Sequence, residues 1–423
     1  MDQDIDLPSA DVAFRLTIGD FGRQFHSQAD LNPTLIGIDS TAKKVDRAET
    51  IKEALSSVPE EEREKVANLI DSAWRPGTPI DPSVDDPVAA VLLREYPNEL
   101  WLHYTLHILI NASRALSPEA VLVQSLLVSA VASFDALLGR LAEAYCREHP
   151  DSLDGIALRL AYDSSRGAND LLEEALSAVR EKVSRGSINE RLAFFRDKGG
   201  SILDSRDKDS LQEIFWRRNL LVHNSVRAED QYLRHFNDTR LGSRNPRDVN
   251  RQYWLESINH LYSCGLLLAV TVWLSAKPQA PAPLKLLATR AYMALTTPLG
   301  PAALRFFGYL GDARGGSSDN PTDQVNYWLA RKFTGNFEGV RAEIETWSHP
   351  ALSQPVYRLA QQCLLGNEGE SIVLLEQLVD DGALDATELA TWPLFHDLRG
   401  NPNWPRIYAK APTQSNSQKH EKS

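Results

Sequence analysis

The sequence has few cysteines and none of the short motifs that mark common enzyme classes. Its 423 residues include three cysteines, Cys146, Cys264 and Cys363, which are odd in number and far apart. They cannot form a disulfide framework or a C-x-x-C metal site. The G-x-G-x-x-G, P-loop, H-E-x-x-H and G-x-S-x-G patterns are absent, so dinucleotide, P-loop nucleotide, zinc-protease and serine-hydrolase functions lack support. We expect a chain that uses no metal or cofactor and works in the reducing cytoplasm.

Long apolar runs are also missing. The best one, from Cys264 to Leu274, is about half the length of a membrane span. The first residues, Met1 to Asp6, have neither the basic nor the apolar part of a signal peptide. We therefore expect a protein that is neither exported nor membrane-embedded.

The length of the chain indicates two or three domains, because a single core stops growing at about 250 to 300 residues.

Excess positive charge is absent too, and the formal net charge is -12. This total argues against nucleic acid only if the acidic residues lie where binding would occur, since phosphates require clustered Lys and Arg. Residues 1–100 hold 20 acidic and 10 basic residues, and the rest of the chain is close to neutral. Residues 206–251 carry 10 basic and 7 acidic residues. The net charge therefore does not exclude an RNA partner.

Apolar residues recur three and four positions apart along nearly the whole chain, and strand–turn–strand patterns are absent. This pattern predicts an all-α protein. Breaks rich in Pro divide it, at 76–87 and around Pro278, Pro281 and Pro283. The predicted parts are an acidic helical region (1–90), a helical bundle (91–276), a Pro-rich linker (277–288), helical repeats (289–410) and a disordered tail (411–423).

The predicted repeats rest on a weak internal similarity. The segment Tyr327-Trp-Leu-Ala is followed by Gly335-Asn336, and thirty residues later Tyr357-Arg-Leu-Ala is followed by Gly366-Asn367. Paired helices of about this period resemble tetratricopeptide repeats, whose unit is about 34 residues. We expect this region to bind a protein partner or trigger.

The most informative segment runs from Asp209 to Asn224. On a helical wheel its apolar residues form one stripe, and Arg218 falls in the centre of that stripe. Asn219 and His223 are four residues apart and lie along its edge. The apolar residues of the stripe are Leu211, Ile214, Phe215, Leu221 and Val222. Three polar groups thus converge on a face that is otherwise suited to burial.

These groups suit RNA cleavage without a metal. An imidazole moves protons near neutral pH, and a guanidinium binds phosphate through two hydrogen bonds. The 2′-hydroxyl of the RNA would be the nucleophile, which gives a 2′,3′-cyclic phosphate and a 5′-hydroxyl. The alternative is structural: Arg218 pairs with a buried carboxylate such as Asp135, and His223 only caps the helix end.

The segment from Arg218 to His223, Arg-Asn-Leu-Leu-Val-His, resembles the R-N-x3-H form of the motif of HEPN domains. These are helical bundles that include many RNases of toxin–antitoxin, abortive-infection and CRISPR systems. The segments Ser133-Phe-Asp-Ala-Leu-Leu and Ile188–Phe195 look like earlier helices of that bundle, so the resemblance covers roughly residues 95–275. It implies that His223 is the catalytic acid or base, that Arg218 stabilises the scissile phosphate, that Asn219 supports both, and that Asp135 neighbours them.

The resemblance also implies a homodimer in which two motif helices form a composite cleft for RNA. The segment 234–251 departs from the family pattern and carries a net charge of +3. It is either an RNA-contacting loop or a solvated linker. We expect Arg217, Arg240, Arg244 and Arg247 to contact RNA.

The leading hypothesis is therefore a regulated HEPN endoribonuclease, acting as a toxin or in phage defence, whose acidic first ninety residues restrain the cleft. One alternative is a non-catalytic scaffold that dimerises through the bundle and binds a protein or nucleotide partner. Another is a bundle that accepts a modifying group from a partner enzyme.

Overall fold

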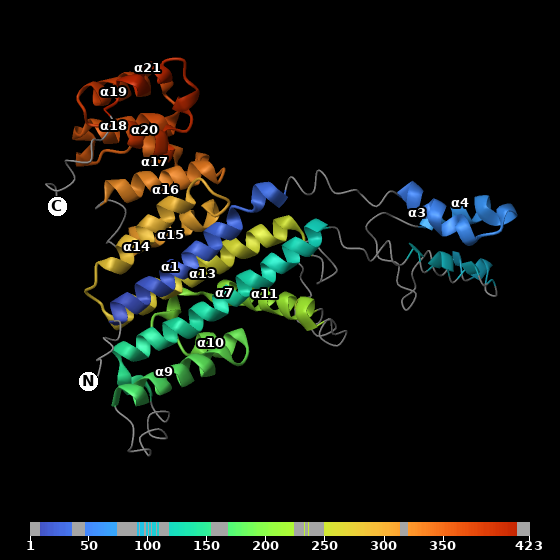
Figure 1. Ribbon diagram of the computed structural model, residues 1–423. Helices are drawn as coiled ribbons and strands as arrows, with labels where there is room; N and C mark the ends of the chain where they lie inside the picture. Colours follow the sequence, from blue (N-terminus) through green and yellow to red (C-terminus); the bar gives the residue numbers. More distant parts are fainter. Residues whose placement is uncertain are drawn as a thin grey trace, which may run out of the picture. The chain divides into compact units, whose positions relative to one another are not determined.

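The computed structural model describes residues 9–35, 47–73, 91–92, 94–96, 99, 101–102, 104–106, 108–109, 118–153, 168–223, 232, 236, 249–313 and 320–412. Within these ranges every regular element is a helix and no strand occurs, which confirms the all-α prediction (Figure 1). The chain divides into two units. The larger unit comprises Met1–Asn32, Leu126–Asp248 and Gln252–Ser423, and the smaller comprises Pro33–Ser125 and Val249–Arg251.

The longer helices of the larger unit include α1 (Ala10–Ala29), α7 (Pro118–Glu148, from residue 126 on), α9 (Ala168–Ser184), α10 (Ile188–Ala193), α11 (Ser205–His223) and α13 (Arg251–Ala276). They form a bundle in which α1, α7 and α13 lie side by side (Figure 1). Helix α13 lies at its centre, with both of its tryptophans and most of its other side chains buried.

The N-terminal helix α1 is part of the bundle, which corrects the prediction of a separate N-terminal region up to residue 90. Its face made of Phe14, Ile18, Phe21 and Phe25 is 0–2% exposed. Phe14 stacks on Trp273 of α13 with ring centroids 5.5 Å apart, and the Trp273 indole N–H donates to Asp11 at 3.0 Å. The apolar face of α1 fills the groove beside α13, which is why it joins this unit.

Gly265 lets α1, α7 and α13 approach one another closely. A Cβ atom there would lie 2.5 Å from the ring of Phe21 and 2.8 Å from a methyl group of Leu137. Both neighbours are almost fully buried, so neither has room to move.

Replacing Gly265 with alanine is therefore expected to lower the free energy of unfolding by about 1–3 kcal/mol, the usual cost of overpacking a core. Gly308→Ala in α15 is the matched control, because a Cβ there meets no atom within 4 Å. That control should be neutral or stabilise by up to about 1 kcal/mol through helix propensity. Urea denaturation of both variants measures the difference, and equal behaviour would refute the packing argument.

The smaller unit has its own core. Its helices include α3 (Arg47–Ala54) and α4 (Arg63–Ala73), within the region predicted to be helical. Val66 and Ile70 of α4 pack in one cluster with Leu92, Leu102 and other residues up to Leu109. Residues 92–109 therefore belong with α3 and α4, and the predicted start of the bundle at residue 91 is wrong.

The C-terminal helices are α14 (Ala282–Ala294), α15 (Gly300–Ala313), α16 (Pro321–Phe333), α17 (Glu338–Glu345), α18 (Pro355–Leu365), α19 (Glu368–Asp380), α20 (Ala386–Thr391) and α21 (Trp404–Lys410). Helix α14 begins inside the predicted linker 277–288, because Pro281 and Pro283 suit a helix start and do not extend the chain. The α13 side chain of Asn259 donates to the carbonyl of Pro298 at 2.8 Å. The C-terminal helices thus pack directly on the bundle.

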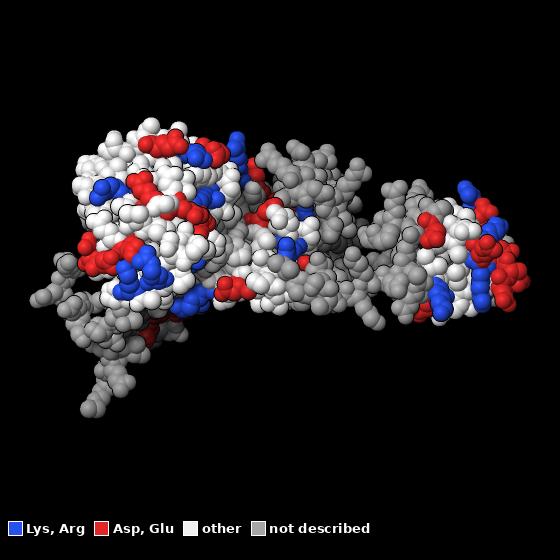
Figure 2. All heavy atoms as spheres, turned by 90° about the horizontal axis from the view of Figure 1, so that it is seen from above, with Lys and Arg blue, Asp and Glu red and all other residues white. Residues whose placement is uncertain are grey.

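Paired helices occur where the internal similarity predicts them. Gly335 and Gly366 have φ angles of 76° and 77° and end α16 and α18. Figure 2 shows acidic and basic side chains intermixed over the C-terminal helices. One such group joins Glu376 of α19 to Arg406 and Lys410 of α21, and these hydrogen bonds lower the pKa of Glu376 to about 2. Of the predicted tail, residues 413–423 lie outside the described residues.

Two helices, α7 and α13, are long and apolar enough to cross a membrane by length and composition. For α13, 78% of the most apolar window is buried inside the protein, and for α7 the share is 39%. Core helices of globular proteins have the same composition, so this observation alone does not place the chain in a membrane.

Candidate functional site

Helix α11 carries the R-N-x3-H segment, and it is buried on more than one face. Leu211, Ile214 and Phe215 are at most 5% exposed, as the predicted stripe requires. At its C-terminal end the prediction is wrong, because Val222 is 50% exposed whereas Leu220 is 1% exposed. The wheel assumed a single covered face, but Tyr232 and Tyr253 cover a second one.

The most deeply buried arginine of α11 is Arg217, at 1% exposure. It pairs with Glu213 one turn earlier, and its Nε lies 3.2 Å from the hydroxyl of Tyr232. The Tyr253 hydroxyl donates to Glu213 at 2.7 Å, and the Arg217 guanidinium lies 4.3 Å from the centroid of the Tyr253 ring. Burial and the Glu213 carboxylate raise the pKa of both tyrosines, which therefore stay protonated as donors. The burial of this side chain argues against the predicted RNA contact of Arg217.

Arg218 points to another group of residues. Its Nη2 donates to Oδ2 of Asp135, on α7, at 3.0 Å. Asp135 also accepts from Arg191 of α10, and both guanidiniums lie over the ring of Phe215, 5.7 and 5.8 Å from its centroid. Burial raises the pKa of Asp135, and the two arginines oppose this change. Two guanidiniums share one carboxylate, so Arg191, Arg218 and ionised Asp135 together carry a net positive charge.

The contact between Arg218 and Asp135 was expected from both readings of the sequence. The HEPN resemblance places Asp135 beside the motif, and the structural alternative makes it the partner of Arg218. The second arginine, Arg191, was not predicted. The sequence Ser187-Ile-Asn-Glu190 is the signal that could have indicated it, because its capping box begins α10 and so fixes the position of Arg191 in the last turn of this short helix.

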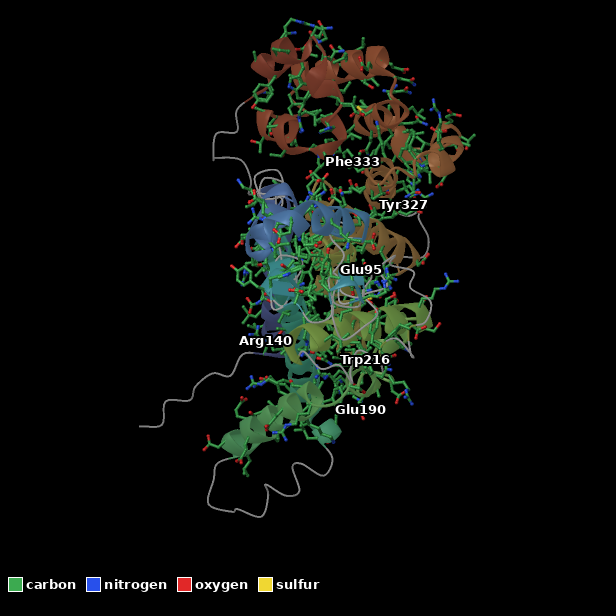
Figure 3. All side chains as sticks on the ribbon, turned by 90° about the vertical axis from the view of Figure 1, so that its right-hand side faces the viewer. Glu95, Arg140, Glu190, Trp216, Tyr327 and Phe333 are labelled. Atoms are coloured by element: carbon green, nitrogen blue, oxygen red, sulfur yellow. The ribbon has the colours of Figure 1, made fainter. Side chains whose placement is uncertain are left out.

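A pocket of about 130 Å³ lies beside this group, between the start of α10 and the middle of α11. Its lining includes Arg191, Gln212, Trp216, Arg218 and Asn219, and none of the described residues that line it is acidic. Asn219 is exposed, and in Figure 3 the labels of Trp216 and Glu190 mark α11 and α10, the two helices that line the pocket. Guanidinium groups bind phosphates, and an indole ring stacks on a nucleobase. This pocket has both kinds of side chain, together with amide groups. Sequence reasoning missed Gln212 and Trp216, because a wheel shows no pocket.

The remaining predicted site residues are not all described. His223 is the last residue of α11, so its backbone continues the helix one turn beyond Asn219, but its side chain lies outside the described residues. Arg240, Arg244 and Arg247 also lie outside them. The structure thus brings together Arg218, Asn219 and Asp135.

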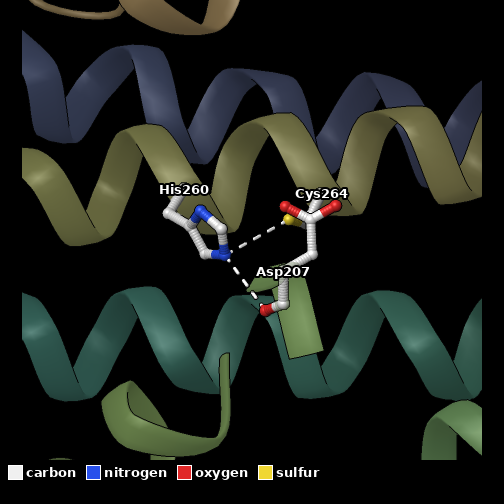
Figure 4. A group of neighbouring side chains, drawn as sticks. All are labelled: Asp207, His260 and Cys264. Atoms are coloured by element: carbon white, nitrogen blue, oxygen red, sulfur yellow. Dashed lines mark hydrogen bonds between the residues drawn. The ribbon is translucent and has the colours of Figure 1, made fainter. Parts of the chain in front are cut away.

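A second cluster has the residue types of a metal site. Asp207 at the start of α11 and His260 and Cys264 of α13 offer ligand atoms within 4.8 Å of one another (Figure 4). Arg305 of α15 already provides a positive charge there, since it pairs with Asp207 and lies 3.4 Å from the Cys264 sulfur. Burial lowers the pKa of His260 and raises that of Cys264 to about 12. As folded, the cluster joins three helices, and a cation would have to displace Arg305.

Comparisons of this chain with protein-family models, with curated proteins and with solved structures find no match.

Proposed function

We propose that this chain is a metal-independent endoribonuclease of the HEPN type whose active site is built on α11. The observation that carries the proposal is the group formed by Arg218, Arg191 and Asp135, beside the exposed Asn219 and a pocket without acidic lining residues. Its positive charge suits the phosphate of an RNA backbone. Asp135 pairs with Arg218, and both guanidiniums lie over the ring of Phe215.

In the proposed reaction the 2′-hydroxyl oxygen of the RNA attacks the adjacent phosphorus, and the P–O5′ bond breaks. His223 takes the proton from the 2′-hydroxyl or gives one to the departing 5′-oxygen. Arg218 donates to the phosphate oxygens and stabilises the charge that develops on them, with Asn219 beside it. The products are a 2′,3′-cyclic phosphate and a 5′-hydroxyl. Because the RNA supplies its own nucleophile, the chemistry requires no metal or cofactor.

The proposal includes a homodimer and a cytoplasmic role in defence or as a regulated toxin, which rest on the family resemblance. Val222 and Asn219, both exposed on α11, lie on a surface that a second motif helix could cover. The acidic first ninety residues remain the proposed restraint, and of these residues 33–90 belong to the smaller unit. A protein partner is proposed for the C-terminal helices.

The chemistry of the RNA ends tests this function. Purified full-length chain is incubated with a 5′-labelled RNA in the presence of EDTA, and the product ends are identified. We expect cleavage that EDTA does not affect, with cyclic phosphate or 3′-phosphate at one end and 5′-hydroxyl at the other. Products with 3′-hydroxyl ends, or activity that EDTA abolishes, would reject the mechanism.

The ion pair of Arg218 with Asp135 favours a second candidate, a non-catalytic scaffold. Such a pair can be purely structural, because a partly buried arginine needs an anion. The scaffold predicts that the wild-type chain dimerises and leaves RNA intact under every condition that permits binding. RNA that binds and remains uncut would favour it.

A further inference from the structure

The C-terminal helices enclose a second pocket, with a volume of about 330 Å³. It is lined by Tyr292 of α14, Asn326 of α16, Tyr357 of α18, Glu388 in the first turn of α20, and Trp392 directly after that helix. In Figure 3, Tyr327 and Phe333 mark the helix that carries Asn326. The volume falls in the range of pockets that hold a ligand or a peptide side chain.

Asn326 is the residue that suggests a ligand. Its side chain is 8% exposed, lines the pocket, and has no hydrogen-bond partner among the residues that the structure describes. Its neighbours on α16 differ: Gln324 donates to Glu343 at 3.0 Å, and Thr322 lies 2.9 Å from the hydroxyl of Tyr357. The amide faces the open space of the pocket, so its donor and acceptor are available to a bound molecule. An amide both donates and accepts, as a peptide main chain does.

The charge of the pocket selects the class of ligand. Among the described residues that line it, Glu388 is the one ionisable acid or base other than the tyrosines. Arg399 lies near Tyr292, but its Nη2 donates to the carbonyls of Leu389 and Trp392 at 3.2 and 2.9 Å. The rings of Tyr292, Tyr357 and Trp392 provide faces that attract a cation. A carboxylate beside three aromatic rings is complementary to a lysine or arginine side chain.

We propose that this pocket binds an extended peptide segment of a partner protein through one lysine or arginine side chain. The cationic group lies against the aromatic rings and Glu388, and a main-chain amide of the peptide pairs with Asn326. Val325 and Val356, which also line the pocket, contact the aliphatic part of the side chain. The site uses none of the α11 residues, so it stands whether or not the chain cleaves RNA.

Saturation-transfer NMR on the full-length chain tests this proposal, since it detects millimolar binding. The probes are the capped pentapeptides Ac-Ala-Ala-Xaa-Ala-Ala-NH2 with arginine, lysine, leucine or glutamate at the central position. We expect signal transfer to the arginine and lysine peptides, and at least several-fold weaker binding of the leucine and glutamate peptides. Equal binding of the leucine peptide, tighter binding of the glutamate peptide, or no binding of any peptide would overturn the proposal.

Two variants tie the binding to this pocket. Asn326→Leu should weaken the arginine peptide by about tenfold, the value of one or two lost hydrogen bonds. Glu388→Gln removes the charge and keeps the capping of α20, because glutamine can accept the N–H of Asp385 as Glu388 does. Glu370→Gln, on the exposed surface of α19, is the control and should bind like wild type. Unchanged binding by both pocket variants, with folding verified by thermal melting, would show that the peptide binds elsewhere.

Discussion

Replacing His223 with alanine is expected to lower the rate of RNA cleavage by about 100- to 10,000-fold, because the reaction then loses its general acid or base. Arg218→Ala should cost about 100- to 1,000-fold, the usual effect of removing one donor to a developing oxyanion. Arg218→Lys keeps the charge but not the two-pronged geometry, so we expect most of that loss to remain. Initial rates on a labelled RNA, under single-turnover conditions, measure these changes.

Lys208→Ala is the matched control for these variants, because Lys208 is exposed on the same helix and lies outside the pocket. It should cleave RNA at the wild-type rate. Thermal melting of all four variants separates lost chemistry from lost folding. Wild-type rates in both His223→Ala and Arg218→Ala would eliminate α11 as the catalytic helix.

Arg217→Met is expected to lower the free energy of unfolding by about 3–5 kcal/mol, because it leaves the buried Glu213 carboxylate without its cation. The double variant Arg217→Met/Glu213→Leu should recover part of this loss, because an apolar pair replaces both charges but leaves the hydroxyls of Tyr232 and Tyr253 without their acceptor. Denaturant unfolding followed by circular dichroism gives the three free energies.

This prediction also decides between two roles for Arg217. If Arg217→Met unfolds as wild type does but loses affinity for RNA, the side chain reaches RNA, as the sequence alone suggested. If stability falls and the double variant restores part of it, Arg217 holds α11 to Tyr232 and Tyr253. The 1% exposure of Arg217 favours the second result.

Helical periodicity was sufficient to predict the fold class and the position of α11, whose predicted start at Asp209 lies within one turn of Ser205. It was insufficient to tell Arg217 from Arg218. One residue along a helix turns a side chain by about 100°, so the result depends on which faces are covered. Tyr232 and Tyr253 come from segments later in the chain, and local sequence does not show where they pack.

The place of α1 was missed for a different reason. Phe14, Ile18, Phe21 and Phe25 follow a helical spacing that is visible in the sequence, yet the partner of that face lies in α13. Proline was misread in a similar way. Pro281 and Pro283 indicated a linker, whereas both lie at the start of α14, where proline is tolerated. In both cases the residue pattern was present in the sequence, but the role of the segment depended on which distant helices it packs against.

Helix α1 packs against α13, so it cannot reach its final position until the ribosome has made α13. More than two hundred residues separate the end of α1 from the start of α13, so the ribosome needs roughly 10 to 45 s to make the second helix after the first. During that time the four apolar residues of α1 lack their final partner, and α11 is made before the helix that completes its bundle. The nascent chain therefore passes through a stage in which the helix proposed to carry the activity exists without the core that positions it. The bundle that surrounds the proposed site is therefore completed only after residue 276 has been made.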